Sequence, residues 1–559
     1  MRKHISNLLV SNLLVPVVVI GIWQFVDPVL VHGSPPDVVK SRDYSETVTS
    51  RSGETLYIED LRADIEITGV ESEELSVKCR LEVKDSDGDF LQRFADNSQL
   101  ILEPYSDGYH LTFETPKSRG YYNDKTGEDV SFFRKIFDRG HWNMSTSTSL
   151  QVEVPRQFSL EIENKFGDIS IRGVEGLLNV TNASGEVRIT DCGGELELTS
   201  SYAPAEIINF EGEVVVENSN GEVKLNNIHG GAEVNNSYSR VTFDQIRGPL
   251  VVQSQNSDVE GSSVQGDCEI RSSYKTIEVS RVEGSLDVEG PNCTVRVSGV
   301  QDDVIIANSY REVSVDSVTG MLEITSSSSP VKVSHVSGDV AVHTSYKDIL
   351  IEHVGGSLDI DGESCPVSAF DIEGDVTILS SYKPIIIENV GGTLDVDASS
   401  GAVTATNIGK DAMIVSTYQP IQVYTVRGDL EVDGSSCSVM AENIDGDVEV
   451  SNSYKYVILK GTAGSILVES ESSPIEVSGI LGVPEDGSIE LITTYKPVKV
   501  SVPVELDVKV SASTQYGKIR SDYPIYLIED DDGHILVEQE GEGIQIRVET
   551  SHDITIRKE

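Results

Sequence analysis

Two histidines and two aspartate-rich segments are the residues whose types could support metal chemistry. His335 and His353 are 18 residues apart, so they would form a pair of metal ligands only if an 18-residue repeat placed them in adjacent coils. Residues 85–89 and 529–534 are acidic, and their carboxylates would suit calcium. Neither segment has the spacing of a calcium-binding loop, so we expect solvated turns there. We therefore predict no metal site and no cofactor, with the histidine pair as the open alternative.

The cysteines have the wrong spacing for zinc. None of the six belongs to a C-x-x-C or C-x-x-x-C pair, which structural zinc sites commonly use. Three of them, Cys293, Cys365 and Cys437, follow one another at a constant interval in the sequence. Whether any two cysteines can form a disulfide therefore depends on the repeat that positions them.

Eight tyrosines recur with a 36-residue period. They are Tyr202, Tyr238, Tyr274, Tyr310, Tyr346, Tyr382, Tyr418 and Tyr454. Phe166 continues the column before them, and Tyr495 continues it after an insertion near residues 484–487. Halfway between the tyrosines stand small residues, either Asn or Ser. We interpret this column as structural, with each ring filling a corner over a small side chain so that packed volume stays constant. A solvent-facing aromatic ladder that binds sugar rings is the functional alternative.

One segment gathers aromatic and basic side chains in an acidic chain. Residues 117–144 form a long irregular insertion, in which Phe133, Ile136 and Phe137 would share one face of a short helix. A helix that packs over the end of the fold is the structural interpretation. The functional alternative is a docking element for a partner or a membrane, formed by Phe132, Phe133, Arg134, Lys135, Phe137 and Trp142.

Carboxylate pairs of the kind used in glycoside hydrolysis could arise by chance on so acidic a chain. No cluster of them stands out, and the even spacing from Tyr202 to Tyr454 excludes the long loops that wall the grooves of β-helix enzymes. We therefore predict no enzymatic activity and no catalytic residues. A carbohydrate-active parallel β-helix enzyme remains as an alternative.

A glycine column with half the tyrosine period indicates how all these side chains are positioned. The column spans residues 176–464, and only Asp302 and Lys410 interrupt it. Such a glycine marks a turn with positive φ or a close approach of two backbones. Between the glycines apolar residues alternate, as Val376 and Ile378 do, which predicts short half-buried strands. Each 18-residue unit is therefore one coil of two or three strands.

A single coil cannot bury its apolar face alone, so the coils must stack. The sequence predicts an all-β fold, a parallel β-solenoid of 18-residue coils in 36-residue double-coil repeats, with strand-rich ends that do not repeat. About 18 coils at ~4.8 Å each make a rod on the order of 85–90 Å long. His335 and His353, one coil apart, would stack ~5 Å from each other. The three evenly spaced cysteines, four coils apart, would be separated by ~19 Å, too far for a disulfide, so we expect free thiols.

The chain divides into four regions. Residues 1–33 combine a basic start with a long apolar stretch, which predicts a signal peptide or a signal anchor. Residues 34–163 are rich in strands and begin the solenoid, residues 164–497 form its regular part, and residues 498–559 form C-terminal strands or a cap. We expect an exported protein of the cell envelope, the cell surface or the periplasm.

The formal charge of −49 limits the choice of partner. A field of this sign repels nucleic acid and anionic membrane surfaces, and it favours cations, cationic peptides or basic protein patches. The plain structural interpretation is a solvated surface that resists aggregation. We expect no nucleic-acid partner, and membrane contact only through an N-terminal anchor.

Several phrases of the sequence resemble the DUF4097 family of bacterial adhesins. These are the strand-rich opening, the phrase from Val154-Pro155 to Gly167-Asp168-Ile169, the coils punctuated by Gly-Asp or Gly-Gly, and the closing residues 550–556. The resemblance covers roughly residues 44–559, although His552 stands where the family usually has glycine or asparagine. It implies a β-solenoid of the cell envelope, some relatives of which belong to envelope-stress and antimicrobial-peptide responses, and it supplies no catalytic residues.

Together these patterns predict a non-enzymatic, adhesin-like binding rod at the cell surface. Its ligand would be a glycan, a protein or a cationic peptide. A structural scaffold or an envelope-stress sensor is the alternative function. The ends do not repeat, which favours a capped, monomeric rod over a polymer.

Overall fold

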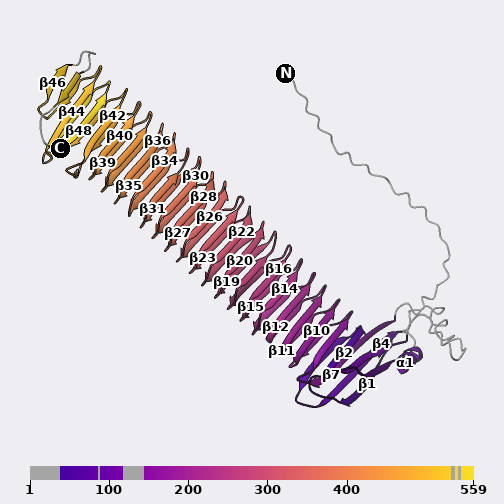
Figure 1. Cartoon of the computed structure of the whole chain (residues 1–559). Coiled ribbons are helices and arrows are strands. Elements are labelled where there is room, and N and C mark those ends of the chain that lie inside the picture. Colours follow the sequence, from indigo (N-terminus) through magenta and orange to yellow (C-terminus); the bar gives the residue numbers. More distant parts are fainter. Residues whose placement is uncertain (1–37, 86–87, 117–143, 530–534, 539–542) are drawn as a thin grey trace, which may run out of the picture.

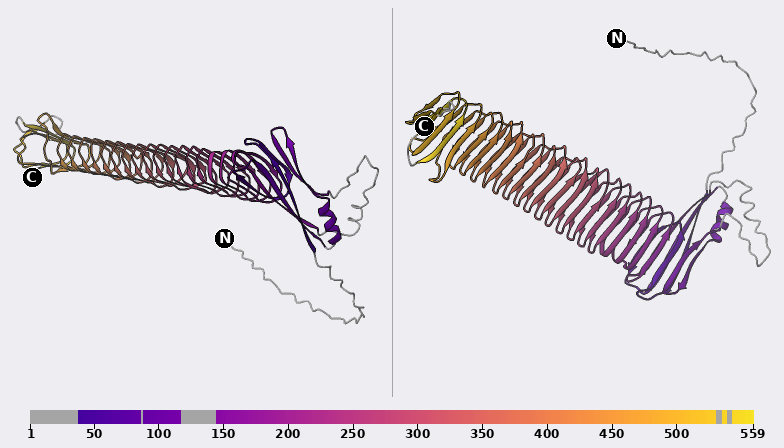
Figure 2. Two further views of the ribbon diagram at one scale, coloured as in Figure 1. Left: turned by 90° about the horizontal axis from the view of Figure 1, so that it is seen from below. Right: turned by 45° about the horizontal axis from the view of Figure 1, so that its top comes forward.

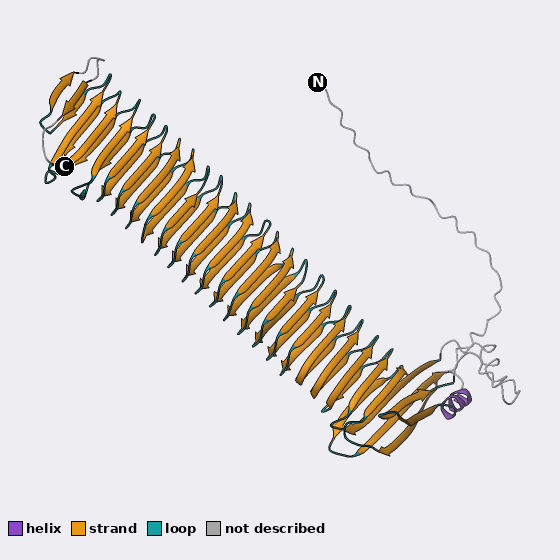
Figure 3. Cartoon of the chain, viewed as in Figure 1, coloured by secondary structure: helices purple, strands orange, loops and turns teal. Residues whose placement is uncertain are grey.

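The computed structural model describes residues 38–85, 88–116, 144–529, 535–538 and 543–559. These residues form a long rod that is nearly all β (Figures 1 and 3). It is a parallel β-solenoid of about 18 turns, which confirms the predicted fold class. The predicted leader at residues 1–33 and the docking residues from Phe132 to Trp142 lie outside the described residues.

Within the described ranges, no helix combines the length and the apolar character that crossing a membrane requires.

Each regular coil consists of two strands, as the coil of β26 (Val340–Ser345) and β27 (Ile349–Val354) shows. Each strand pairs in parallel with its equivalent in the next coil, so that Val340 lies opposite Leu358 and Ile349 opposite Val367. Repetition of these pairings builds two parallel ladders along the rod (Figure 2). The ladders face each other across a single continuous apolar core.

The period-two alternation of each strand supplies this core. In β26 and β27, Val342 and Ile351 are fully buried, while His343, the next residue after Val342, is exposed. Branched side chains such as Val and Ile suit a pleated surface that is covered on one side. The core therefore repeats almost unchanged from one coil to the next.

The glycine column is explained mainly by close contact between coils, since only Gly194 and Gly212 of the column have positive φ. The N–H of Gly374 donates to the carbonyl of Gly356 over 3.0 Å, and a Cβ added to Gly374 would lie 2.5 Å from that carbonyl oxygen. The aspartate after the glycine caps the next coil. Asp375 Oδ1 accepts the backbone N–H of Thr393 over 2.8 Å, and the same bond recurs along the column. The Gly-Asp dipeptide therefore stabilises the stacking of adjacent coils.

Positive φ occurs instead at a second corner, in the column that contains His335 and His353. Their φ angles are 54° and 58°, and the same left-handed conformation recurs in this column from Asp191 to Gly479. Asn, Asp, Gly and His tolerate this conformation best, and they dominate the column. Neighbouring side chains form a hydrogen-bonded ladder, in which Asn407 Nδ2 donates to Asn389 Oδ1 over 2.9 Å.

The N-terminal end of the rod is assembled out of sequence order. β2 (Thr55–Leu61) and β3 (Asp64–Val70) form one coil that lies between two others. The strands beside it are β6 (Gly108–Glu114) and β7 (Ser145–Pro155) on the outside, and β8 (Ser159–Asn164) and β9 (Ile169–Arg172) on the inside. The first complete coil of the chain is therefore paired on both sides.

An antiparallel extension covers this end. β7 pairs with β4 (Glu74–Asp85), and β4 pairs with β1 (Val38–Thr49). The helix α1 (Gly88–Asp96) packs against β4, with Leu91 and Phe94 buried. The acidic segment at residues 85–89 was predicted to be a solvated turn, but Asp85 is buried at the end of β4 and Gly88 already begins α1.

The C-terminal end of the rod is also assembled out of sequence order. β48 (Ile544–Thr550) and β49 (Ile554–Lys558) form a coil that lies between two earlier coils. The strands beside it are β42 (Ser488–Thr493) and β43 (Val498–Val502) on one side, and β44 (Val508–Thr514) and β45 (Ile519–Ser521) on the other. The last strands of the chain thus have partners on both sides.

Candidate functional site

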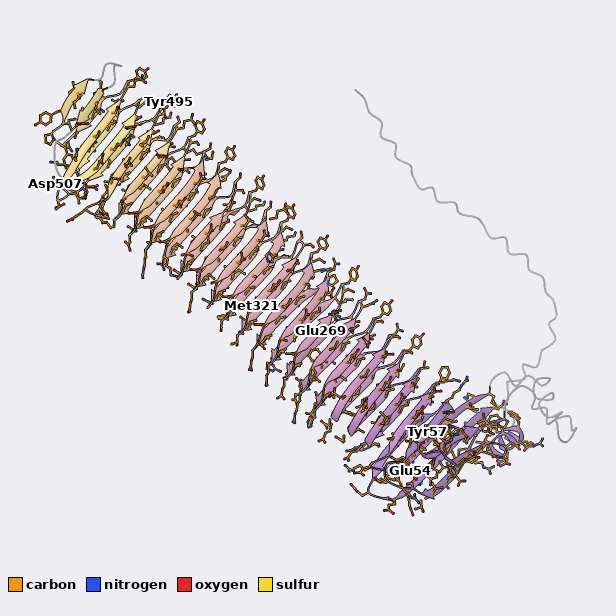
Figure 4. The ribbon with its side chains drawn as sticks, in the orientation of Figure 1. Glu54, Tyr57, Glu269, Met321, Tyr495 and Asp507 are labelled. Carbon is orange, nitrogen blue, oxygen red and sulfur yellow. The ribbon has the colours of Figure 1, made fainter. Side chains whose placement is uncertain are left out.

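The tyrosine column forms one edge of the rod, and its side chains are exposed. Each tyrosine follows the first strand of a coil, as Tyr346 follows β26. The eight tyrosines are 57–72% exposed. Figure 4 shows a row of rings that stands out from one edge of the rod, with Tyr495 near its C-terminal end. The prediction that each ring fills a packed corner is therefore wrong. We call this row the tyrosine edge.

The alternation between coils arises from the packing of the residue that directly follows the corner residue. In the coils without tyrosine, the residue after the corner is small and buried, as Cys293, Ser329 and Cys365 are. In the tyrosine coils a buried polar side chain bonds to the backbone of that small residue. Asn308 Nδ2 donates to Cys293 O over 3.0 Å, and Thr344 Oγ1 donates to Ser329 O over 3.3 Å. The interior thus explains the 36-residue period without any use of the rings.

The tyrosines also carry unfavourable backbone conformations. Five of them have φ between 63° and 69°: Tyr274, Tyr310, Tyr346, Tyr382 and Tyr418. Bulky residues rarely adopt this left-handed region, and each such residue costs on the order of 1–3 kcal/mol. The alternate coils place Asn256, Asn292, Ser364 and Ser436 in the same conformation. Small polar residues therefore suffice for the turn, and the fold does not require tyrosine there.

Basic side chains accompany the rings in the C-terminal two thirds of the edge. The residue after the tyrosine is exposed and is Lys275, Arg311, Lys347, Lys383, Lys455 or Lys496, and only Tyr418 is followed by an uncharged residue, Gln419. Lys455 Nζ reaches back two coils to donate to Tyr418 O over 2.8 Å. In the first two tyrosine coils the same position holds Ala203 and Ser239, so this part of the edge has no such cation. The sequence pattern itself predicts a gathering of basic and aromatic residues at residues 117–144.

A polar groove lies beside this N-terminal part of the tyrosine edge. Its walls come mainly from the ends of the first strands of six successive coils. The lining residues include Thr199, Ser201, Glu217, Ser219, Asn235, Ser237, Gln253, Gln255, Arg271, Ser273, Glu289 and Pro291. Ser201, Ser237 and Ser273 directly precede Tyr202, Tyr238 and Tyr274. We call this feature the edge groove.

The edge groove carries hydroxyl, amide and a few charged groups. Arg271 lies between two carboxylates, forming ion pairs with Glu269 and with Glu289, the latter over 3.2 Å. Glu217 adds a further carboxylate to the lining. The groove is therefore polar and mildly acidic.

No family model, no curated protein and no solved structure matches this chain.

The histidine pair lies on the opposite corner and has the predicted spacing. The ring centroids of His335 and His353 are 5.0 Å apart. Each Nδ1 contacts a carboxylate, that of His335 at 3.0 Å from Asp316 Oδ1 and that of His353 at 3.2 Å from Asp371 Oδ2. In the described part of the chain, no group of three or more His, Cys, Asp or Glu side chains is arranged to hold a metal ion. The pair is part of the polar corner column.

The cysteines are free and buried, which confirms the expected thiols. Cys293, Cys365 and Cys437 stand in one column inside the solenoid. Burial raises the pKa of all six thiols, and it raises the pKa of Cys79 and Cys268 to about 12. Thiols that remain protonated are poor nucleophiles. The cysteines therefore act as small core residues.

The sequence contains a signal for the tyrosine edge in the residues that alternate with the rings. Asn and Ser alternate with Tyr in one column, and Asn is a residue that tolerates positive φ. That pattern indicates a turn position, at which the side chain points outward. The edge groove had no sequence signal, because it is formed by residues of six coils.

Proposed function

We propose that this protein is a non-enzymatic, adhesin-like binding rod of the cell envelope, and that the tyrosine edge is its ligand-binding surface. The observation that carries this proposal is the exposure of all eight tyrosines, five of them in a strained conformation that Asn and Ser adopt at lower cost in the alternate coils. Strained residues that the fold does not require are concentrated at functional sites.

The chemistry of the edge supports a binding role. Tyrosine offers a large, rigid contact area and a polar hydroxyl, and it is enriched in protein-binding surfaces for that reason. The rings stand on a rigid, repetitive scaffold, so they are positioned before a ligand arrives, which lowers the entropic cost of binding. The resemblance to the DUF4097 adhesin family and the predicted export leader agree with this role.

The test compares the full chain with a variant in which all eight tyrosines become Asn. Asn220, Asn256 and Asn292 occupy the same column, so the variant should keep its fold, with a melting temperature equal to or above that of the wild type. The probes are purified peptidoglycan sacculi, an array of neutral and charged oligosaccharides, and polylysine. We expect the wild-type chain to bind at least one probe and the variant to lose that binding.

Equal binding by the two proteins to every probe that either of them binds would overturn the proposal. So would the absence of any binding by the wild-type chain. Such results would favour a scaffold that spaces envelope components, because a spacer has no need of exposed rings.

A further inference from the structure

We infer that the edge groove, together with Tyr202, Tyr238 and Tyr274, binds an extended, neutral, β-linked glycan chain. This inference rests on the proposed function and adds the class of ligand and its place on the edge. The groove and the three rings belong to the same coils, because the lining residues Ser201, Ser237 and Ser273 directly precede the three tyrosines. A long, regular surface of this kind fits a long, regular polymer.

The lining of the edge groove has the chemistry that sugars require. Hydroxyl groups of Ser201, Ser219, Ser237 and Ser273 can both donate and accept hydrogen bonds, and the amides of Asn and Gln do the same. A sugar ring presents hydroxyls around its edge and C–H groups on its faces. The rings of the tyrosine edge can therefore cover a sugar face while the groove bonds to its hydroxyls.

The spacing of the rings selects the form of the glycan. Successive tyrosines lie two coils apart, which is ~9.6 Å along the rod. An extended β-1,4-linked chain presents the same ring face at every second sugar, at a spacing of similar size. The intervening coils carry Asn220 and Asn256, whose small side chains leave room for the sugar between two platforms. The ladder is therefore suited to a polymer with a two-sugar repeat.

The charges at the edge groove exclude anionic glycans. Arg271 is already paired with two carboxylates, and Glu217 faces the same groove. Two of the three rings are followed by Ala203 and Ser239, and Lys275 after Tyr274 is the one cation at this position beside the groove. The net charge of −49 adds a long-range repulsion against polyanions. A neutral chain meets no such barrier.

A proline-rich peptide is the rival occupant with a similar repeat. A polyproline II helix has three residues per turn and repeats every ~9.3 Å. Such peptides bind in grooves lined by aromatic side chains. The edge groove is instead lined mainly by Ser, Asn, Gln and Glu, which favours the glycan.

The experiment uses the full chain and two matched triple variants. The groove variant is Tyr202→Asn/Tyr238→Asn/Tyr274→Asn, and the distal variant is Tyr382→Asn/Tyr418→Asn/Tyr454→Asn. Both make the same change in the same column, but only the first touches the edge groove. Calorimetric titration would use four probes: cellohexaose, chitohexaose, a heparin hexasaccharide and decaproline.

We expect at least one neutral hexasaccharide to bind, and the groove variant to weaken that binding by about tenfold or more, because three aromatic contacts are lost. The distal variant should weaken that binding less than the groove variant, the corresponding disaccharide should bind more weakly, and heparin should not bind. Three results would overturn the inference: no binding of either neutral hexasaccharide, equal loss in both triple variants, or binding of decaproline alone. If the eight-tyrosine variant still loses binding to another probe, the proposed function stands and only the glycan assignment fails.

Discussion

The hydroxyl of Tyr346 donates a hydrogen bond to Glu363 Oε1 in the next coil, over 3.1 Å. This bond lies outside the solenoid, since both residues are exposed. It raises the pKa of the Tyr346 hydroxyl, chiefly because a carboxylate accepts from the protonated form. Among the hydroxyls of the eight tyrosines, all of which lie in the described part of the chain, no other makes a side-chain hydrogen bond. The tyrosine edge is thus a surface with little internal bonding of its own.

Replacing a tyrosine of the edge should not destabilise the fold. We expect Tyr346→Asn to leave stability unchanged or to raise it by about 1 kcal/mol, because Asn relieves the strain at φ 63°. In the same coil, Ile351→Ala should cost about 2–5 kcal/mol, since Ile351 is fully buried. Urea unfolding of both variants measures the difference. A comparable loss in both would show that the ring packs against the coil.

The sequence predicted the distances between residues that occupy the same position in different coils, because every coil has the same length. The constant coil length placed His335 beside His353 and separated Cys293 from Cys365, and both relationships are found in the structure. The direction of the tyrosine side chains could not be predicted in the same way. The period-two rule applies to strands and fails at corners, where φ changes sign. The repeat therefore accepts either a large residue such as Tyr or a small one such as Asn or Ser at this corner.

The strand pairing at the two ends of the rod could not be predicted from local sequence patterns. Strands β2 and β48 each lie between coils that are distant in sequence, and no short-range signal specifies such pairing. The helix α1 had a weak signal in the spacing of Phe90, Leu91 and Phe94. So short a helix offers too few turns for a helical period to be recognised beside an acidic segment.

The glycine column should not tolerate a methyl group without cost. We expect Gly374→Ala to lose about 1–3 kcal/mol, because the new Cβ would crowd the carbonyl of Gly356. Gly482→Ala is the matched control, since a Cβ there would meet no atom within 4 Å. Thermal unfolding of the two variants gives the comparison. The chain itself has Lys410 in this column, so folding should survive the change. Equal melting of both variants would contradict the close-approach explanation.

The aspartates that cap neighbouring coils should make stability depend on pH. Backbone and hydroxyl donation from Ser285 lowers the pKa of Asp267. A lowered pKa in the folded state means that this contribution is complete above the ordinary aspartate pKa of about 3.9 and is lost as the pH falls through the lower value. We expect Asp267→Asn to be less stable than the wild type at pH 7, with a difference that shrinks below pH 4.

The control for this prediction is Asp287→Asn, which removes the same charge from the exposed face of the next coil. Chemical unfolding at several pH values compares the three proteins. A difference between wild type and Asp267→Asn that stays constant down to pH 2.5 would show that the charge of Asp267 does not matter.

The thiols should be unreactive while the protein is folded. Burial raises the pKa of Cys268 to about 12, so almost no thiolate forms at pH 8. We expect Ellman's reagent to modify none of the six cysteines in native protein and all of them in guanidinium. Ser337→Cys places a thiol on an exposed position and should react within minutes. Rapid native reaction of a wild-type thiol would mean that the coil around it opens.

Removal of the last coil, β48 and β49, should affect β42 and β43, although other strands separate these elements in the sequence. β48 and β49 lie between β42/β43 and β44/β45, so a chain that ends at Gly543 leaves these strands unpaired on the side of the last coil. β42 and β43 then keep only the preceding coil, and β44 keeps only β47 (Ile535–Glu538). A solenoid couples mainly adjacent coils, so the damage should remain at this end. We expect limited proteolysis to begin between residues 488 and 543, while residues 200–450 stay protected. If the coils stacked in sequence order, β42 would keep its neighbours and only residues after 502 would become sensitive. Mass-spectrometric mapping of the first cleavage sites separates these outcomes, because protection of β42 and β43 in the truncated chain would contradict the insertion of the last coil.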